Sequence, residues 1–227
     1  MPEEYATRPL DNEELKLLVT YLRKHKIEPI LVGGQGVMRS KGVEDDSNTK
    51  DTDFMVRNGD DSAIDNGFLL YKLEKENHNK LLFDNIGWVD DGEFSVYAAN
   101  LIRKDKTAKP ARIDFINSYN FTHIFSRSGK DLYKLAKEKY SIPIGIMDET
   151  MLSAHAELIA VMRTIVPAKE KYVAKVERDA KKLLLENEVF EVEEIAEIMK
   201  CLEIDDEKIR YLTSVLKALY QTKTNQL

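Results

Sequence analysis

The chain has 227 residues, of which 43% are hydrophobic and 33% are charged, and its formal net charge is −6 at pH 7. This length suffices for one large domain or two small ones, with a buried core in either case. The negative charge argues against an overall electrostatic grip on nucleic acid, so any such contact must be local.

The start of the sequence and its single cysteine both favour the cytoplasm. Pro2, Glu3 and Glu4 make the N-terminus polar and acidic, unlike a signal peptide, and no apolar run approaches membrane-spanning length. Cys201 is the only cysteine, so no internal disulfide can form. We therefore expect a cytoplasmic protein with no membrane partner.

The first predicted elements lead into a glycine-rich turn. The apolar spacing of residues 11–26 predicts a helix, and a short buried strand follows at 30–32. Gly33 and Gly34 come directly after this strand, where they allow a tight turn with uncovered backbone N–H groups. A short helix should begin there, and its N-terminal amides favour a phosphate. We predict that Gly33, Gly34 and Gln35 bind a nucleotide.

Residues 51–56 predict a second strand, which carries two aspartates at its start. Side chains two apart on a strand point to the same face, so Asp51 and Asp53 should lie side by side. With no basic residue between them the two carboxylates repel each other, and a divalent cation is their natural partner. Oxygen ligands favour magnesium or manganese. The preceding residues 41–50 lack periodicity and predict a loop, either a lid or an unordered stretch.

Three further strands are predicted at 81–86, 94–101 and 112–116, and they should extend one mixed sheet. Asp114 interrupts the last of them. An acid within an apolar strand either faces solvent at an edge or meets a ligand, because burying an unpaired carboxylate is costly. We expect this strand to lie beside the aspartate pair, with Asp114 as a third carboxylate. The alternating aromatic residues of 119–125 predict an extended segment that serves in packing, with stacking of one aromatic ring on a base as the alternative.

From Asp148 onward a helical period replaces the strand-like alternation. The predicted helices cover residues 148–166, 169–185, 191–202 and 205–222. We expect them to form a bundle. A helix-turn-helix reader of DNA is disfavoured by the many acids in these helices.

One side of the helix at 169–185 carries a basic stripe. Its members follow helical spacing: Lys171, Lys175, Arg178 and Lys182. The stripe is either a solvated face balanced by neighbouring acids, or a surface that holds a triphosphate or an RNA backbone. On the second reading, Lys175 and Arg178 are candidate nucleotide-binding residues.

These features together resemble the nucleotidyltransferase superfamily, whose pattern is a Gly-Gly or Gly-Ser turn, an Asp-x-Asp flanked by apolar residues and a later isolated Asp on a strand. The run Thr49-Lys50-Asp51-Thr52-Asp53 is similar to AbiEii-type proteins of toxin-antitoxin and phage-defence systems. In that group a helix after the sheet carries a basic-acidic pair near the site, which Arg178-Asp179 resembles. The positions that match the superfamily pattern are Gly33, Gly34, Asp51, Asp53 and Asp114.

The sequence departs from the pattern at three places. Gln35 follows the glycines where Ser, Thr or Ala is usual. An expected Arg before Thr49 is missing. An acidic insert, Glu44, Asp45 and Asp46, lengthens the gap before the aspartate pair.

The resemblance implies an α/β fold, with a nucleotidyltransferase-like mixed sheet flanked by helices in residues 1–147 and a helical bundle in 148–227. It implies transfer of a nucleoside monophosphate from a nucleoside triphosphate to a hydroxyl of RNA, protein or a small molecule. Mg²⁺ or Mn²⁺ would be held by Asp51, Asp53 and Asp114. An alternative is a non-catalytic nucleotide-binding or toxin-antitoxin-related protein that keeps the fold, and a third reading makes the acids mere surface residues.

Overall fold

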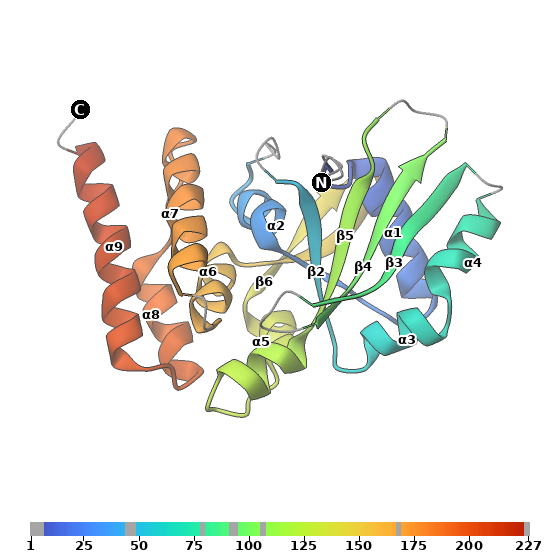
Figure 1. Cartoon of the computed structure of the whole chain (residues 1–227). Coiled ribbons are helices and arrows are strands. Elements are labelled where there is room, and N and C mark those ends of the chain that lie inside the picture. Colours follow the sequence, from blue (N-terminus) through green and yellow to red (C-terminus); the bar gives the residue numbers. More distant parts are fainter. Residues whose placement is uncertain are drawn as a thin grey trace, which may run out of the picture.

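The computed structural model of the chain describes residues 7–43, 49–77, 80–90, 95–104, 108–166 and 169–224, without the side chains of 125, 169–172 and 222–224. Seven strands form one mixed sheet in the order β3-β4-β5-β2-β1-β7-β6 (Figure 1). The pairs β1–β7 and β2–β5 are parallel, and the other neighbours are antiparallel. The strands are β1 (Ile30–Val32), β2 (Asp51–Val56), β3 (Leu81–Asp90), β4 (Ser95–Arg103), β5 (Ala111–Asn117), β6 (Ser141–Ile146) and β7 (Glu149–Ala154).

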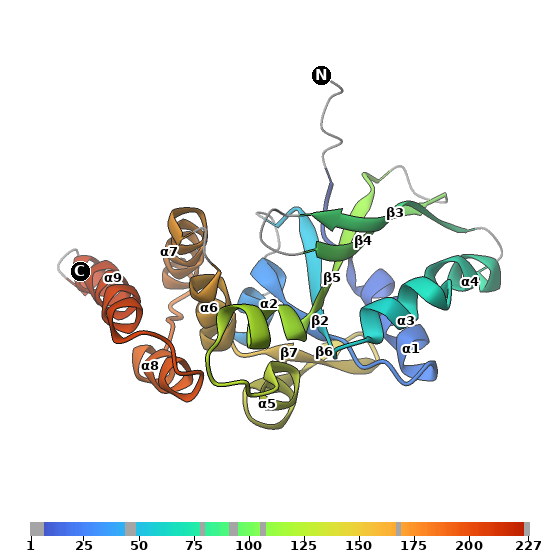
Figure 2. The same cartoon turned by 60° about the horizontal axis from the view of Figure 1, so that its bottom comes forward.

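Helices cover both faces of this sheet. They are α1 (Asn12–Lys24), α2 (Gly33–Ser40), α3 (Asp60–Asn66), α4 (Leu69–Glu76), α5 (Leu132–Lys139), α6 (Ala156–Ile165), α7 (Lys169–Leu185), α8 (Val192–Cys201) and α9 (Asp206–Thr224), with a π-helix η1 (Asn120–Phe125). In both views α7, α8 and α9 lie together at one end, far from α3 and α4 (Figures 1 and 2). No helix in the described part of the chain is long and apolar enough to cross a membrane.

The alternation of β2 assigns its side chains to two separate cores. Phe54 faces one core together with α1, α3 and α4, and its ring stacks on Phe115 of β5 with 5.8 Å between centroids. Met55 faces the other core, which α2, α5 and α6 share with the C-terminal helices. Asp51 and Asp53 alternate with Thr52 and Phe54, so they share the face of Met55. The strand therefore delivers its acids to the side where the C-terminal helices pack.

The predicted α/β architecture, a mixed sheet flanked by helices, is confirmed. The strand that carries Asp114 does lie beside the aspartate pair, because β5 is the parallel neighbour of β2. Helix α1 also begins as expected, where Asp11 and Glu14 form a reciprocal capping box.

The prediction that the helical region begins at residue 148 is wrong. Residues 149–154 form β7, which lies between β1 and β6. Met151, Ser153 and Ala154 are buried there, so the strand lacks the alternation of a half-exposed one. Helix α6 begins only after His155, its N-cap. The division of the chain into two domains at residue 147 stays a prediction.

One local prediction also fails. Residues 120–125 form the π-helix η1 instead of an extended segment, and the backbone N–H of Tyr119 donates to Asn117 Oδ1 (2.8 Å) where the chain leaves β5. Phe121 nevertheless packs into the core with 4% exposure. The acidic insert at 44–46 lies outside the described residues.

Candidate active site

Three carboxylates converge on one face of the sheet. In the parallel register of β2 and β5, Asp53 lies opposite Asp114 and Asp51 lies opposite Arg112. One carboxylate oxygen from each aspartate lies within 4.8 Å of the others. The predicted convergence of Asp51, Asp53 and Asp114 is thus present, and these acids do not face different sides.

The electrostatics of this cluster favour a bound cation. Burial, and then the charges of Asp51 and Asp114, raise the pKa of Asp53 well above its ordinary value, whereas Lys175 and Arg163 act in the opposite direction. The charge of Asp53 is therefore poorly compensated by its protein surroundings. Oxygen ligands in this number and spacing fit a magnesium or manganese ion, which would supply the missing positive charge.

The glycine turn lies directly against the second aspartate. Gly33 follows β1 with φ +67°, and a Cβ atom built on it would lie 1.9 Å from Asp53 Oδ2. A Cβ atom on Gly34 would lie 2.5 Å from the Cγ2 atom of Thr49. Both positions therefore require glycine, because the backbone passes close to the carboxylate on one side and to the chain entering β2 on the other.

We expect Gly33→Ala to lower the affinity for Mn²⁺ at least about tenfold, because the new methyl group must displace the carboxylate of Asp53. Calorimetric titration measures this affinity. Gly42→Ala is the matched control, since Gly42 has a similar φ of +73° but no atom within 4 Å of its added Cβ. Equal losses of affinity in both variants would trace the effect to backbone strain and contradict the close approach.

Two basic residues of α7 and one of α6 line the same cavity as the glycines. Arg163, Lys175 and Arg178 all line it. The guanidinium of Arg163 donates to Asp179 Oδ2, and Arg178 Nε lies 3.5 Å from Asp179 Oδ1. The Asp179 side chain is only 5% exposed. A buried acid therefore holds two arginines at the wall of the cavity.

The residues of the predicted basic stripe on α7 differ in whether they line the cavity. Lys175 and Arg178 line the cavity, whereas Lys182 does not. The side chain of Lys171 lies outside the described part of the structure. Asp179, an acid of the same helix, pairs with both Arg163 and Arg178.

Gln35 is the predicted site residue that the structure places elsewhere. Its side chain is fully buried, with its amide donating to Leu10 O (3.1 Å) and its Oε1 accepting from Thr52 Oγ1 (2.9 Å). Thr52 alternates to the face of β2 opposite the aspartates. Gln35 therefore fixes the start of α2 to β2 and does not line the cavity.

The cavity has a volume of about 490 Å³, which lies within the range of small-molecule sites. Its lining includes the three aspartates and the basic residues. It also includes apolar side chains, among them Val89, Val96, Ile116, Phe121 and Met162. A ligand with an anionic part and an apolar part would match this lining.

Sequence patterns did not predict two of the cavity residues, Arg112 and Arg163. Arg112 stands two residues before Asp114 and so shares its strand face. Arg163 is the single basic residue of helix α6, most of whose residues are apolar. A charge in such a helix or strand is costly unless it meets a partner, so both arginines, like Asp114, were candidates for the site.

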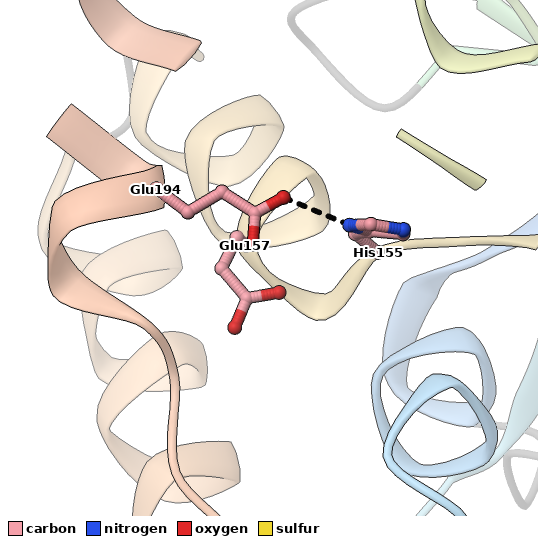
Figure 3. A group of neighbouring side chains, drawn as sticks. All are labelled: His155, Glu157 and Glu194. Carbon is pink, nitrogen blue, oxygen red and sulfur yellow. Dashed lines mark hydrogen bonds and ion pairs between the residues drawn. The ribbon is translucent and has the colours of Figure 1, made fainter. Parts of the chain in front are cut away.

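A second group of potential metal ligands lies at the start of α6. His155 Nδ1 lies 2.8 Å from Glu194 Oε1, with Glu157 beside the pair (Figure 3). Glu157 Oε1 lies 2.7 Å from Lys41 Nζ and accepts a hydrogen bond from the backbone N–H of Glu191 (2.8 Å). The contacts of this group join α2, α6 and α8. Because Lys41 already supplies a positive charge to Glu157, the group is a weaker metal candidate than the aspartates.

Comparisons with known proteins give a similar solved structure. It is described as the crystal structure of an antigenic nucleotidyltransferase-like protein from Paracoccidioides brasiliensis, with a TM-score of 0.45 and 18% sequence identity over 75% of each chain. No protein-family model matches the chain, and no curated protein matches it. The function is therefore inferred from the site itself.

Proposed function

We propose that this protein is a metal-dependent nucleotidyltransferase, which moves a nucleoside monophosphate from a nucleoside triphosphate to a hydroxyl acceptor. The observation that supports this best is the convergence of Asp51, Asp53 and Asp114 within 4.8 Å beside a glycine turn. Acids in this arrangement suit metal ions that bind phosphate oxygens, and the turn admits a phosphate close to the backbone.

The aspartates and the glycines would have separate roles. Asp51 and Asp53 would hold Mg²⁺ or Mn²⁺, with Asp114 sharing one ion. Such ions, when bound, neutralise phosphate charge and lower the pKa of an acceptor hydroxyl. Gly33 and Gly34 would let the backbone approach the triphosphate.

The basic residues of α6 and α7 would bind the same triphosphate. Lys175 and Arg178 line the cavity from α7, and Arg163 joins them from α6. Their positive charges would neutralise the charge that develops on the leaving pyrophosphate. Asp179 would keep both arginines in place.

The reaction is an in-line displacement at the α-phosphorus. The acceptor oxygen forms a bond to this phosphorus while the bond to the bridging oxygen of the β-phosphate breaks. The bridging oxygen keeps the electron pair and leaves as part of pyrophosphate. Asp114 would take the proton of the acceptor hydroxyl.

Sequence features support a finer assignment. The run Thr49-Lys50-Asp51-Thr52-Asp53 and the pair Arg178-Asp179 are similar to AbiEii-type proteins, so we propose that the protein acts in a toxin-antitoxin or phage-defence setting with RNA, protein or a small molecule as acceptor. Under this assignment the nucleotidyltransferase-like domain, predicted as residues 1–147, also includes strand β7, and the helices that follow it form the helical domain.

One observation favours a second candidate, a nucleotide-binding protein without turnover. Gln35 occupies the position where a small hydroxyl residue or alanine is usual, and its buried amide is engaged with Leu10 and Thr52. The turn would then bind a triphosphate without a hydroxyl from the residue that follows the glycines. Such a protein would keep the fold and the metal ligands but transfer nothing.

A transfer assay separates the two candidates. The purified protein is incubated with each of four α-labelled nucleoside triphosphates, Mg²⁺ and total RNA or protein extract, with a parallel reaction in EDTA. We expect Mg²⁺-dependent label on a macromolecule or small-molecule product, together with pyrophosphate. Tight binding of a triphosphate with no label transfer and no pyrophosphate would contradict catalysis and support the binding protein.

A further inference from the structure

Arg112 lies next to two members of the aspartate cluster. It is the cross-strand neighbour of Asp51 in the parallel register, and it stands two residues before Asp114 on the same face of β5. Its Nε donates a hydrogen bond to Asp114 Oδ1 at 2.7 Å. In the described part of the chain, Asp114 is the only acceptor of this guanidinium. The side chains of Arg112 and Asp114 are 24% and 17% exposed, so the pair is partly screened from water.

The position of Arg112 differs from that of the other cavity cations. The strand order places β2 between β5 and β1. Arg112 therefore approaches the carboxylates from the β5 side, whereas the glycine turn follows β1 on the other side. Arg163, Lys175 and Arg178 come from α6 and α7, which pack with α2 in the core on that face. The cations proposed to bind the triphosphate therefore lie on α6 and α7, whereas Arg112 lies on β5.

Asp114 needs a fixed orientation to take part in the cluster. Its carboxylate faces two others, and like charges at this distance repel each other. A free aspartate would rotate away to lower this repulsion. A charge-assisted hydrogen bond to one carboxylate oxygen opposes that rotation, because turning the group would break the bond.

We propose that Arg112 is a positioning residue for Asp114, which holds this carboxylate toward Asp51 and Asp53 and so sets the rate of transfer but not the affinity for the triphosphate. This inference rests on the proposed function for its kinetic part. Its structural part, the orientation of Asp114, holds for the protein whether or not it turns over. A partly exposed ion pair adds little to stability by itself, so the role of the pair must be sought in geometry.

Two variants and a control test this role. Arg112→Gln removes the charge, and Arg112→Lys keeps it with a different donor. Arg103→Gln is the matched control. Arg103 lies on strand β4 of the same sheet and also pairs with an acid, Glu13 of α1 (3.1 Å), but it does not line the cavity. We expect Arg112→Gln to lower kcat about 10- to 100-fold with the KM for the triphosphate within about twofold of wild type. Arg112→Lys should recover part of kcat, and Arg103→Gln should change neither constant.

Two kinetic outcomes would overturn the inference. A raised KM with unchanged kcat would make Arg112 a triphosphate-binding residue, and unchanged constants would leave it without a role. A crystal structure of the Arg112→Gln variant gives a readout that needs no activity. In it the carboxylate of Asp114 should turn away from Asp51 and Asp53. If it stays in place the positioning role is wrong, whereas absence of transfer by the wild type contradicts only the proposed function.

Discussion

Asp53→Asn is expected to lower the transfer rate at least about 10²- to 10³-fold while making the metal-free protein more stable. The loss of rate follows from the loss of a metal ligand at the centre of the cluster, opposite Asp114 and against Gly33. The gain in stability follows because the neutral amide removes a repelled, desolvated charge.

The pH dependence has a defined sign. Because burial and the neighbouring carboxylates raise the pKa of Asp53, the folded protein binds this proton more tightly than the unfolded chain does. The free energy of unfolding of the metal-free wild type should therefore fall as the pH rises from about 3.9, the ordinary value for Asp, to the raised pKa in the folded state. The Asp53→Asn variant should lack this part of the slope.

Thermal unfolding in EDTA and in Mg²⁺ measures both effects. At pH 7.5 in EDTA, Asp53→Asn should melt at least about 2 °C above the wild type, and Mg²⁺ should stabilise the wild type more than the variant. Asp84→Asn is the control, because Asp84 lies on the edge strand β3 and does not line the cavity. A variant that melts below the wild type in EDTA, or that retains transfer, would contradict the assigned role of Asp53.

Lys41→Met is expected to destabilise the protein by about 3–5 kcal/mol. The Glu157 side chain is only 2% exposed, and Lys41 supplies the positive charge at 2.7 Å. Without it the buried carboxylate keeps, among the residues that the structure describes, the hydrogen bond from the backbone N–H of Glu191. Since Lys41 is the C-cap of α2, the ion pair also connects the glycine-turn helix to α6 and α8.

Thermal melts of single and double variants separate the buried charge from the lost contact. Lys41→Met should melt about 10 °C or more below the wild type. Lys41→Met/Glu157→Gln should recover much of this loss, because no charge is left unpaired. The more exposed pair of Lys16 and Asp148 is the control, and Lys16→Met should cost less than about 1 kcal/mol. If Lys41→Met and Lys16→Met melt alike, the pair beside His155 and Glu194 is not a structural junction.

The parts of the fold that sequence predicted well are those where local pattern and burial agree. In β2, the acids Asp51 and Asp53 alternate with the buried Thr52 and Phe54, because the acids face the cavity and the other two face the interior, so the strand and the orientation of Asp51 and Asp53 were both predictable. The strand β7 was not, because Met151 and Ser153 are buried and the helical period of the following residues extends into it. The π-helix at 120–125 contradicts its own aromatic alternation, and the sequence offers no local signal for it.

The residues of the site also differ in how well the sequence predicted their positions. The positions of Gly33, Asp53 and Asp114 could be predicted because Gly33 follows a short apolar run, Asp53 precedes one and Asp114 interrupts one. Gln35 was predicted to bind a nucleotide from its position after the glycines. Position in a motif does not determine which way a side chain turns, and this one turns to Thr52. Arg163 reaches the cavity through the packing of α6 against α7, a tertiary relation that local spacing does not encode.

The central claim is that three aspartates from two neighbouring strands share divalent cations at the mouth of a glycine turn. Crystals soaked with Mn²⁺ and a non-hydrolysable nucleoside triphosphate test it most directly, because the anomalous signal of manganese locates each ion. We expect manganese peaks at about 2.1 Å from carboxylate oxygens of Asp51 and Asp53, with Asp114 bound to one of them and the triphosphate against Gly33. Manganese bound instead at His155, Glu157 and Glu194, or absent from the aspartates at saturating concentration, would contradict the claim.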